Sequence, residues 1–421
     1  MRILILGSGA REHAIALALA REDAGHELLV APGNAGIAAV ARLLPLDPAD
    51  PAAVAEAALE LAVDLVVIGP EAPLMAGVGD AVHERGVPVF GPDRAAARLE
   101  GSKAFAKQVM AAAGVPTGAA VDVLSADTLD AALDTTGSPY VVKADGLAAG
   151  KGVLVTTDRA AAREHALAWL ERGPVLVEQF LAGREASLFF VTDGERAVPL
   201  SPAQDYKRLR DGDDGPNTGG MGAFSPLPWL VAAFGSEREF VDHVRSTVAE
   251  PVLQHLAAEG TPFVGLLYCG LVIDGRDVRV IEFNARFGDP ETQVVLPRLA
   301  TPLSTLLLAA ARGTLDTVPA PRFTPDAAVG VVLASANYPG EPVLGAAITG
   351  VEQAEQLDGV SVVQAATAAA DGALVTTGGR VLTVVGVGDS VEQARTRAYA
   401  GVEAVSFDGA QWRTDIAADV G

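Results

Sequence analysis

The stretch Val278–Gln293, which reads VRVIEFNARFGDPETQ, decides how this chain is expected to fold and work. Its apolar, β-branched beginning predicts a strand. Because side chains on a strand alternate between its two faces, Glu282 and Asn284 should point the same way, with Phe283 on the other side. A carboxylate and an amide oxygen side by side suit Mg²⁺, which completes its shell with water and phosphate oxygens. Arg286 follows where it could reach such a phosphate, although an edge strand with a solvated polar face would carry the same residues.

The composition indicates a globular protein of several domains. A chain of 421 residues, of which 50% are hydrophobic and 5% aromatic, suggests roughly two to four domains. No apolar run reaches the ~18 residues that a membrane span needs, and the start of the chain predicts no signal peptide. The single cysteine, Cys269, excludes an internal disulfide and fits a reducing cytoplasm.

The charge balance argues against two classes of partner. The formal net charge is −22, from 31 basic and 53 acidic residues. Such a surface repels nucleic acid and anionic membranes, and no run of lysine or arginine offsets it. An anionic substrate would therefore have to be bound by a local cluster of donors.

The first hundred residues predict a parallel sheet. Arg2–Leu6 reads as a strand, Gly7–His13 as a glycine turn, and the residues to about Ala20 as a helix. Strand, turn and helix N-terminus together form an anion site that begins like a dinucleotide fingerprint. Glu12 stands where the third glycine belongs, which argues against the alternative of an NAD site. Further strands alternate with helical stretches and imply right-handed crossovers: Glu27–Ala31, Asp64–Ile68 and Val87–Phe90.

The next part of the chain combines strands with a glycine-rich loop. Ser102 is predicted to cap a helix. The strand Tyr140–Lys143 runs into a loop over residues 144–153, with Lys151 at its tip. Its glycines and two lysines suit a triphosphate, whereas a flexible hairpin with two solvated lysines would look the same. Val175–Leu181 reads as another buried strand.

The two stretches 204–208 and 214–222 form one long segment, which is charged in the first stretch and glycine-rich in the second. Loops of this length inside compact domains are usually functional. Prolines in 319–325 predict a linker. The remaining predicted elements are a helix over Glu239–Glu259, strands over Leu266–Ile273, Ala328–Ala334 and Arg380–Val385, and a helix that Ser390 caps and that runs to about Ala404.

Several of these strings together carry a resemblance to a known family. Glu-x-Asn-x-Arg resembles the metal and phosphate strand of the ATP-grasp ligases. The strings REHA, GPEAPL, KADGLAAGKG, DGPNTGGMGA, EFNARFGDPETQ and GGRVL, in this order, resemble the phosphoribosylamine–glycine ligase family over essentially the whole chain. Two positions depart from that family's pattern, because Tyr206 stands where histidine is expected and Ala417 where glycine is usual.

The resemblance implies an α/β fold of three domains. It places an N-terminal Rossmann-like parallel-sheet domain at residues 1–101. It places a central ATP-grasp domain at 102–318, with a mobile lid subdomain at about 115–187. It places a small C-terminal α/β domain at 326–421.

The resemblance also implies an enzyme, a carbon–nitrogen ligase that forms ADP. It would join glycine to 5-phosphoribosylamine through a glycyl phosphate intermediate in de novo purine biosynthesis, with ATP and Mg²⁺ (or Mn²⁺). Three alternatives remain: an NAD-dependent oxidoreductase, a nucleotide-binding module without catalysis, and another carboxylate–amine ligase of the ATP-grasp class. The expected partners are these small molecules alone, with no nucleic acid and no membrane. A cytoplasmic monomer is expected, with transient contacts to neighbouring purine-pathway enzymes.

The resemblance assigns site residues one by one. Cys269 and Gly270 occupy the neighbouring strand where many relatives carry another acid, so the implied metal ligands are only Glu282 and Asn284. The implied catalytic residues are Arg286, Lys151 and Asp289. The implied ATP-binding residues are Lys103, Lys143, Gly146, Gly150, Lys151, Gly152, Glu178, Phe180, Leu181 and Glu185. The implied substrate-binding residues are Gly9, Arg11, Glu71, Asp205, Thr218, Gly219, Gly220, Met221, Arg286 and Arg380.

Overall fold

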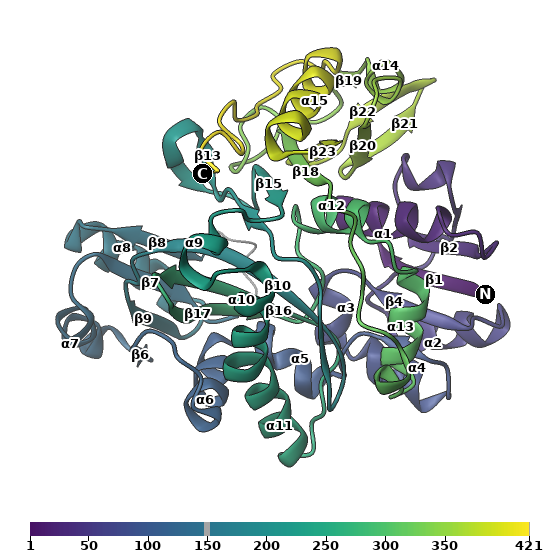
Figure 1. Ribbon diagram of the computed structural model, residues 1–421. Helices are drawn as coiled ribbons and strands as arrows, with labels where there is room; N and C mark the ends of the chain where they lie inside the picture. Colours follow the sequence, from purple (N-terminus) through teal and green to yellow (C-terminus); the bar gives the residue numbers. More distant parts are fainter. Residues whose placement is uncertain (147–151, 421) are drawn as a thin grey trace.

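The computed structural model describes residues 1–146 and 152–420 and has the predicted α/β architecture (Figure 1). An N-terminal parallel sheet, a central pair of antiparallel sheets and a C-terminal sheet follow one another along the chain. Within the described ranges, no helix is both long and apolar enough to cross a membrane.

The N-terminal sheet consists of five parallel strands in the order β3-β2-β1-β4-β5. The central strand β1 is its core, because the side chains of residues 3–6 are completely buried. The predicted strands and the first helix are confirmed, although the last strand begins two residues later than expected. The bounds are β1 Arg2–Gly7, α1 Ala10–Ala20, β2 Glu27–Pro32, β3 Arg42–Leu43, α2 Pro51–Glu60, β4 Leu65–Ile68, α3 Glu71–Ala76, α4 Val78–Glu84, β5 Val89–Phe90 and α5 Arg94–Gly101.

The central region holds two antiparallel sheets. The lid sheet has the order β6-β9-β7-β8 and carries α7 and α8. The second sheet has the order β11-β10-β16-β17. The lid bounds are β6 Ala120–Val123, α7 Ala126–Thr136, β7 Tyr140–Ala144, β8 Val153–Thr156, α8 Arg159–Leu170 and β9 Val175–Gln179. The other bounds are α6 Lys103–Ala113, β10 Arg184–Asp193, β11 Ala197–Pro199, α9 Leu230–Phe234, α10 Glu237–Val244, α11 Glu250–Ala258, β16 Val264–Asp274, β17 Asp277–Asn284, α12 Thr292–Val295 and α13 Leu303–Ala311.

The C-terminal sheet joins two distant parts of the chain. Its order is β12-β15-β18-β23-β20. Two short strands of the central region thus join the sheet, because β15 pairs with β18, which lies beyond residue 326, and β12 pairs with β15. The bounds are β12 Gln204–Asp205, β13 Arg208–Arg210, β14 Asp214–Asn217, β15 Gly222–Ser225, β18 Ala327–Ala334, β19 Ala347–Ile348, α14 Val351–Glu355, β20 Val360–Gln364, β21 Thr367–Ala370, β22 Ala373–Thr376, β23 Arg380–Gly388 and α15 Val391–Ala404. Helix α13 in turn packs between β10 and the strands β4 and β5, which ties the central region to the N-terminal sheet.

Local sequence chemistry explains several of the points at which helices begin or are interrupted. The predicted caps are confirmed, because the side chains of Ser102 and Ser390 accept hydrogen bonds from backbone N–H groups at the start of α6 and α15. The helix predicted over 239–259 is interrupted by a π turn at Arg245–Ala249. Pro251 follows that turn and has no N–H for the regular helical bond to residue 247. The strand predicted to reach Leu181 ends at Gln179.

The end of α2 provides a test of local strain. Ala62 lies just beyond the helix with φ +48°, a left-handed conformation that glycine adopts without cost. Its N–H donates to Leu59 O at 3.0 Å, and Val63 N–H donates to Ala58 O at 2.9 Å, which is the glycine-favouring Schellman pattern. The side chain of Ala62 is exposed and has little packing to lose.

We predict that Ala62→Gly raises the free energy of unfolding by roughly 1 kcal/mol, because the left-handed penalty on alanine disappears. Urea denaturation monitored by circular dichroism measures the change. Ala57→Gly, inside the same helix, is the matched control and should lower stability by roughly the same amount. Equal losses in the two variants would contradict the strain at residue 62.

Candidate functional site

Strand β17 lies at the edge of its sheet, but that edge is covered by other parts of the chain. Val280 N–H donates to Pro116 O at 2.8 Å, and Thr117 Oγ1 donates to Val280 O at 2.7 Å. From the lid, Lys143 Nζ donates to Ile281 O at 3.2 Å. The edge strand of the alternative is present, but its edge is not fully solvated, because Pro116, Thr117 and Lys143 cover it.

Glu282 and Asn284 both project from the partly accessible face of β17, whereas Phe283 is buried. Gly270 lies opposite Glu282 in the register, and a Cβ there would lie only 3.1 Å from Glu282 Cγ. Burial favours the neutral acid, but Lys207, Lys143, Lys103 and Arg286 together lower the pKa of Glu282. The carboxylate is thus held in the ionised form that a metal ligand needs.

The acids around this pair do not form a complete metal cage. Within residues 1–146 and 152–420 there is no group of three or more His, Cys, Asp or Glu side chains that could hold a metal. Cys269 is completely buried on the neighbouring strand, and burial raises the pKa of its thiol. One carboxylate and one amide fit a hard cation that takes its other ligands from phosphate and water.

Lysines from the lid and from α6 lie near β17. Lys143 is 4% exposed, and its Nζ lies 2.8 Å from Glu178 Oε2, while Lys107 Nζ lies 3.6 Å from Glu178 Oε1. Lys103 Nζ donates to Gly146 O at 3.2 Å. Lys143 is therefore not the solvated lysine of the hairpin alternative. The Glu178 carboxylate is already paired, and its backbone lies within β9 between β6 and β7.

The remaining predicted ATP-binding residues lie in different environments. Gly150 and Lys151 are outside the described residues, whereas Gly152 O accepts a hydrogen bond from Ala144 N at 2.8 Å. Phe180 and Leu181 follow the end of β9, and Phe180 is 40% exposed. The exposed ring is a flat apolar surface directly after the end of β9.

Asp205 and Lys207 bring opposite charges to the same region. Lys207 Nζ lies 2.6 Å from Glu185 Oε2. Burial raises the pKa of Asp205 to about 7, although Lys207 lowers it in part. Burial lowers the pKa of Lys207, but the charges of Asp205, Glu185 and Glu282 outweigh this effect and raise it well above its usual value. Together with Lys143 and Lys103, these residues form a lysine–carboxylate cluster around Glu282.

Arg286 is the centre of a second group of charges. Its Nη2 lies 3.0 Å from Glu100 Oε1, and its Nε lies 3.7 Å from Glu71 Oε2. Ala285 N–H donates to Glu100 Oε2 at 2.7 Å. Burial opposes ionisation of the guanidinium, but the carboxylates of Glu100 and Glu71 raise the pKa of Arg286. Among the described residues, the buried Arg286 Nε has no hydrogen-bond partner, so a donor is left for an anion.

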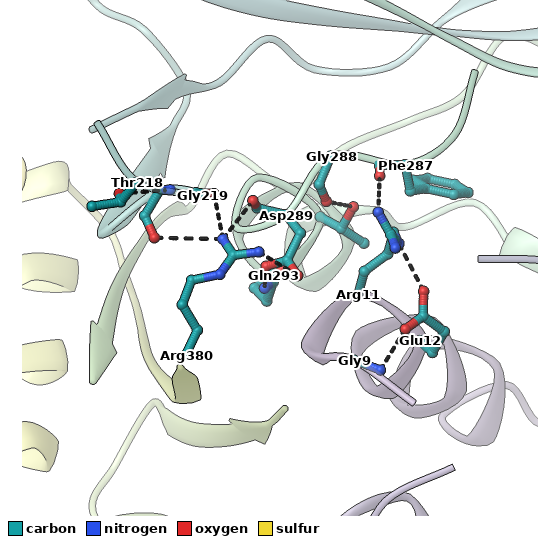
Figure 2. Close-up of polar contacts among 12 residues, drawn as sticks. Gly9, Arg11, Glu12, Thr218, Gly219, Phe287, Gly288, Asp289, Gln293 and Arg380 are labelled. Carbon is teal, nitrogen blue, oxygen red and sulfur yellow. Dashed lines mark hydrogen bonds and ion pairs between the residues drawn. The ribbon is translucent and has the colours of Figure 1, made fainter. Parts of the chain in front are cut away.

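Arg380 reaches this region from β23 and holds two loops together (Figure 2). Its Nη2 lies 3.1 Å from Asp289 Oδ2, and its Nη1 donates to Asp289 O at 2.8 Å and also to Gly219 O. On the other side, Gln293 Nε2 donates to Asp289 Oδ1 at 2.8 Å. Burial opposes ionisation, yet Arg380 and Arg11 keep the pKa of Asp289 below its usual value. Asp289 is thus an ionised carboxylate in a fixed orientation.

The glycine turn after β1 is occupied by an internal carboxylate (Figure 2). Glu12 Oε2 accepts from Gly9 N–H at 2.6 Å, and Glu12 Oε1 lies 2.7 Å from Arg11 Nε. A Cβ at Gly7 or Gly69 would meet the Glu12 side chain at 2.7 or 2.2 Å. The helix terminus that would bind the pyrophosphate of NAD is therefore already filled, which removes the oxidoreductase alternative.

A cavity of about 420 Å³ lies between the N-terminal turn and the C-terminal sheet. Ser8, Gly9, Asp289 and Arg380 are among the residues that line it. Arg11 is not one of the lining residues, and its Nη1 donates to Phe287 O at 3.1 Å. The size and the mixture of arginine, carboxylate and backbone N–H suit a sugar phosphate.

Two predicted substrate residues are engaged within the fold. Thr218 Oγ1 donates to Lys207 O at 2.9 Å and accepts from Gly220 N at 3.0 Å, so it shapes its loop. Met221 is completely buried, and its N–H donates to Tyr206 O at 2.8 Å.

Several site residues were not among the sequence predictions. Glu100 ends an alanine-rich helix, and no local pattern marks it as the partner of Arg286. Gln293 and Glu12 lie within the recognised strings, and Lys207 lies in the charged segment 204–208. They are identified by their contacts with predicted residues: Asp289, Arg11 and Glu185.

Comparison with known proteins covers almost the whole chain. Three phosphoribosylglycinamide synthetase family models match: the N domain at residues 1–100, the ATP-grasp (A) domain at 101–292 and the C domain at 328–419. Proteins called phosphoribosylamine–glycine ligase from Leifsonia xyli and Streptomyces coelicolor are 60% and 56% identical. The first covers 99% of this chain and 100% of its own length, the second 99% of each. The crystal structure of phosphoribosylamine–glycine ligase from Thermotoga maritima has a TM-score of 0.82 and 36% identity, over 99% of this chain and 100% of that one.

The raised pKa of Asp205 makes stability depend on pH. Between the ordinary value of 3.8 and about 7, the folded state holds a proton that the unfolded state has lost. The free energy of unfolding therefore falls as pH rises through this window. We predict that Asp205→Asn removes this component, so that the variant gains stability relative to the parent between pH 4 and 7. Urea denaturation at several pH values measures the difference, with Asp122→Asn on exposed β6 as the control. A difference that is flat with pH would contradict the assignment.

Proposed function

The chain belongs to the phosphoribosylglycinamide synthetase family, and we propose that its two charge clusters form one active site for that family's reaction. The reaction is the ATP-dependent ligation of glycine to 5-phosphoribosylamine in purine biosynthesis. The observation that carries the proposal for the site is the ionised Glu282 among lysines from three segments and beside Arg286. Asp289, three residues after Arg286, lines a cavity of about 420 Å³ together with Arg380.

The chemistry follows from what an amide bond requires. A glycine carboxylate does not react with amines, because oxide is a poor leaving group. In the proposed first step, a carboxylate oxygen attacks the γ-phosphorus of ATP, the bond to the β,γ-bridging oxygen breaks, and ADP leaves. In the second step, the amine of phosphoribosylamine attacks the carbonyl carbon of glycyl phosphate, the carbon–oxygen bond breaks, and phosphate leaves with a proton released from the amine.

The lid and its neighbours are proposed to hold ATP. Lys143 and Lys103 would offset the charge of the phosphates. Backbone groups of residues 178–181 would pair with adenine beside the exposed Phe180, and Glu185 would bind the ribose after exchanging its contact with Lys207. The support is geometric: β9 ends at Gln179, which leaves the following backbone outside the sheet. Gly146, Gly150, Lys151 and Gly152 are proposed to contact the phosphates.

Family members use a divalent metal, and the residues on β17 fit one. We propose Mg²⁺, or Mn²⁺ in its place, held by Glu282 and Asn284, because the first is ionised and the second offers a carbonyl oxygen. When bound, the ion would neutralise charge on the transferred phosphoryl group. Arg286 would add a second positive charge through the Nε that has no partner among the described residues.

The cavity between the terminal domains is the proposed place of phosphoribosylamine. Gly9, Arg11 and Arg380 would surround its phosphate, and Glu71 would accept from the ribose hydroxyls. The ionised Asp289 would accept a hydrogen bond from the amine and so orient it. Asp205, with Thr218, Gly219, Gly220 and Met221, is proposed to lie beside glycine.

The coarser organisation is proposed from the sequence. The domain division is 1–101, 102–318 with the lid at about 115–187, and 326–421. A cytoplasmic monomer is proposed, with any contacts to other enzymes of the pathway transient. Sedimentation velocity at micromolar concentration checks the oligomeric state.

The most direct test follows the carboxylate oxygen. ADP release should require both glycine and phosphoribosylamine made in situ for full turnover, and AMP should not form. With ¹⁸O in the glycine carboxylate, one labelled oxygen should appear in inorganic phosphate, as measured by mass spectrometry. Label in AMP, or pyrophosphate as a product, would rule out the acyl phosphate route.

We predict that Glu282→Gln lowers kcat and shifts the Mg²⁺ dependence to higher concentration, because the variant keeps the size of the side chain but loses its charge. Steady-state rates over a range of free Mg²⁺ measure both effects. Asp274→Asn, on the exposed end of β16, is the matched control and should behave like the parent. Parental Mg²⁺ dependence in Glu282→Gln would contradict the metal assignment.

A further inference from the structure

The last residues of the chain lie against residues 204–222 of the central region. Figure 1 shows the C-terminus beside β13. Thr414 N–H donates to Asp211 Oδ1 at 2.7 Å, and Gly212 N–H donates to Asp415 Oδ2 at 2.8 Å. The tail, defined here as Arg413–Ala417, is therefore bonded to the β13–β14 hairpin.

Arg413 is the main link in this contact, and it is 1% exposed. Its Nε and Nη2 donate to the two carboxylate oxygens of Asp415 at 2.7 and 2.6 Å. Its Nη1 donates to Asp213 Oδ1 at 2.7 Å and to Arg208 O at 3.2 Å. A bidentate pair with two further bonds fixes the guanidinium in one orientation. The hairpin thus depends on a side chain from the opposite end of the sequence.

Tyr206 connects the same tail to the charged residues of the site. Its ring lies under the Arg413 guanidinium, with 4.9 Å from Cζ to the ring centroid, and its hydroxyl accepts from Ala417 N–H at 2.9 Å. Its neighbours Asp205 and Lys207 interact instead with Glu282 and its surroundings. In extended backbone, successive side chains point to opposite sides. The tail therefore contacts the side of the segment that carries Tyr206, and Asp205 and Lys207 point to the other side.

The tail is itself fixed to a rigid element. Arg395, on α15, donates to Ile416 O at 3.0 Å through Nε and to Thr414 O at 2.7 Å through Nη2. From the same helix, the Tyr399 hydroxyl donates to Arg413 O at 2.9 Å. Helix α15 packs on β23 and β18 of the C-terminal sheet. The tail is therefore a rigid strut from that sheet to the hairpin.

We propose that the tail positions residues 204–222, so that Arg413 and Tyr206 act on glycine activation through Asp205 and Lys207 without touching a substrate. This inference rests on the proposed function. Loosening the tail should affect the use of glycine and admit water to glycyl phosphate. It should affect ATP binding much less, because among the described residues the tail makes no hydrogen bond to residues 115–187, and its one indirect link to them is the contact of Lys207 with Glu185, which ATP is proposed to replace.

The test compares Arg413→Met and Tyr206→Phe with Arg397→Met. Arg397 also lies on α15 but bonds Val387 O and Asp358, away from the hairpin, so this control should resemble the parent. We expect Arg413→Met to raise KM for glycine roughly tenfold, with KM for ATP within about twofold. Tyr206→Phe should act in the same direction but less, because it keeps the ring.

The decisive readout is the ratio of ADP to amide product. Complete coupling gives a ratio of one, whereas glycyl phosphate lost to water raises the ratio above one. A variant that is merely less stable would lower the total rate at an unchanged ratio. We expect ratios above one in Arg413→Met and Tyr206→Phe, and a ratio of one in Arg397→Met.

Each outcome decides the question. Parental ratios and glycine KM values in both variants would overturn the inference, and Tyr206→Phe alone decides if Arg413→Met does not fold. If the parent itself forms no ADP in response to glycine and phosphoribosylamine, the proposed function fails and not the role of the tail.

Discussion

The Arg286 guanidinium, buried among carboxylates, is the interaction on which the site depends. Glu100 pairs with it from α5, the helix that ends the N-terminal region, and Glu71 approaches it from the start of α3. Ala285 donates its N–H to the same Glu100, which fixes the end of β17. An unpaired guanidinium at this position would be strongly unfavourable, so the pairing holds the N-terminal region and β17 in one arrangement. The reaction proposed here would need that arrangement, because the proposed ATP and phosphoribosylamine sites belong to different regions.

The same principle explains how an acidic protein prepares a site for anions. Its net charge of −22 gives no long-range attraction for phosphates. The cations of the site are instead paired with carboxylates of the chain: Lys143 with Glu178, Lys207 with Glu185, Arg286 with Glu100, and Arg380 with Asp289. These pairs orient the cations before a ligand arrives, and nearby carboxylates raise the pKa values of Lys207, Arg286 and Arg380. Phosphate groups can then join or replace the internal partners.

Much of the fold could be predicted because its determinants are local. The apolar run of β1, the cap at Ser102 and the alternation of Glu282 with Phe283 are properties of a few adjacent residues. Strings of this kind also placed the chain in its family. The role of Glu12 could not be predicted in this way, since it depends on Gly69 from a different strand lying against its carboxylate.

By itself, the sequence determined the order of the strands and helices, the residue types available to ATP and a metal, and the family. Only the tertiary structure decided which charges are paired. Glu100 meets Arg286 across 186 residues, and Arg413 meets Asp213 across 200. Such pairs form because a buried charge must find a partner, and the partner is set by which surfaces the sheets bring together. Strand alternation and helix caps depend on neighbours along the chain, whereas burial and charge pairing depend on neighbours in space.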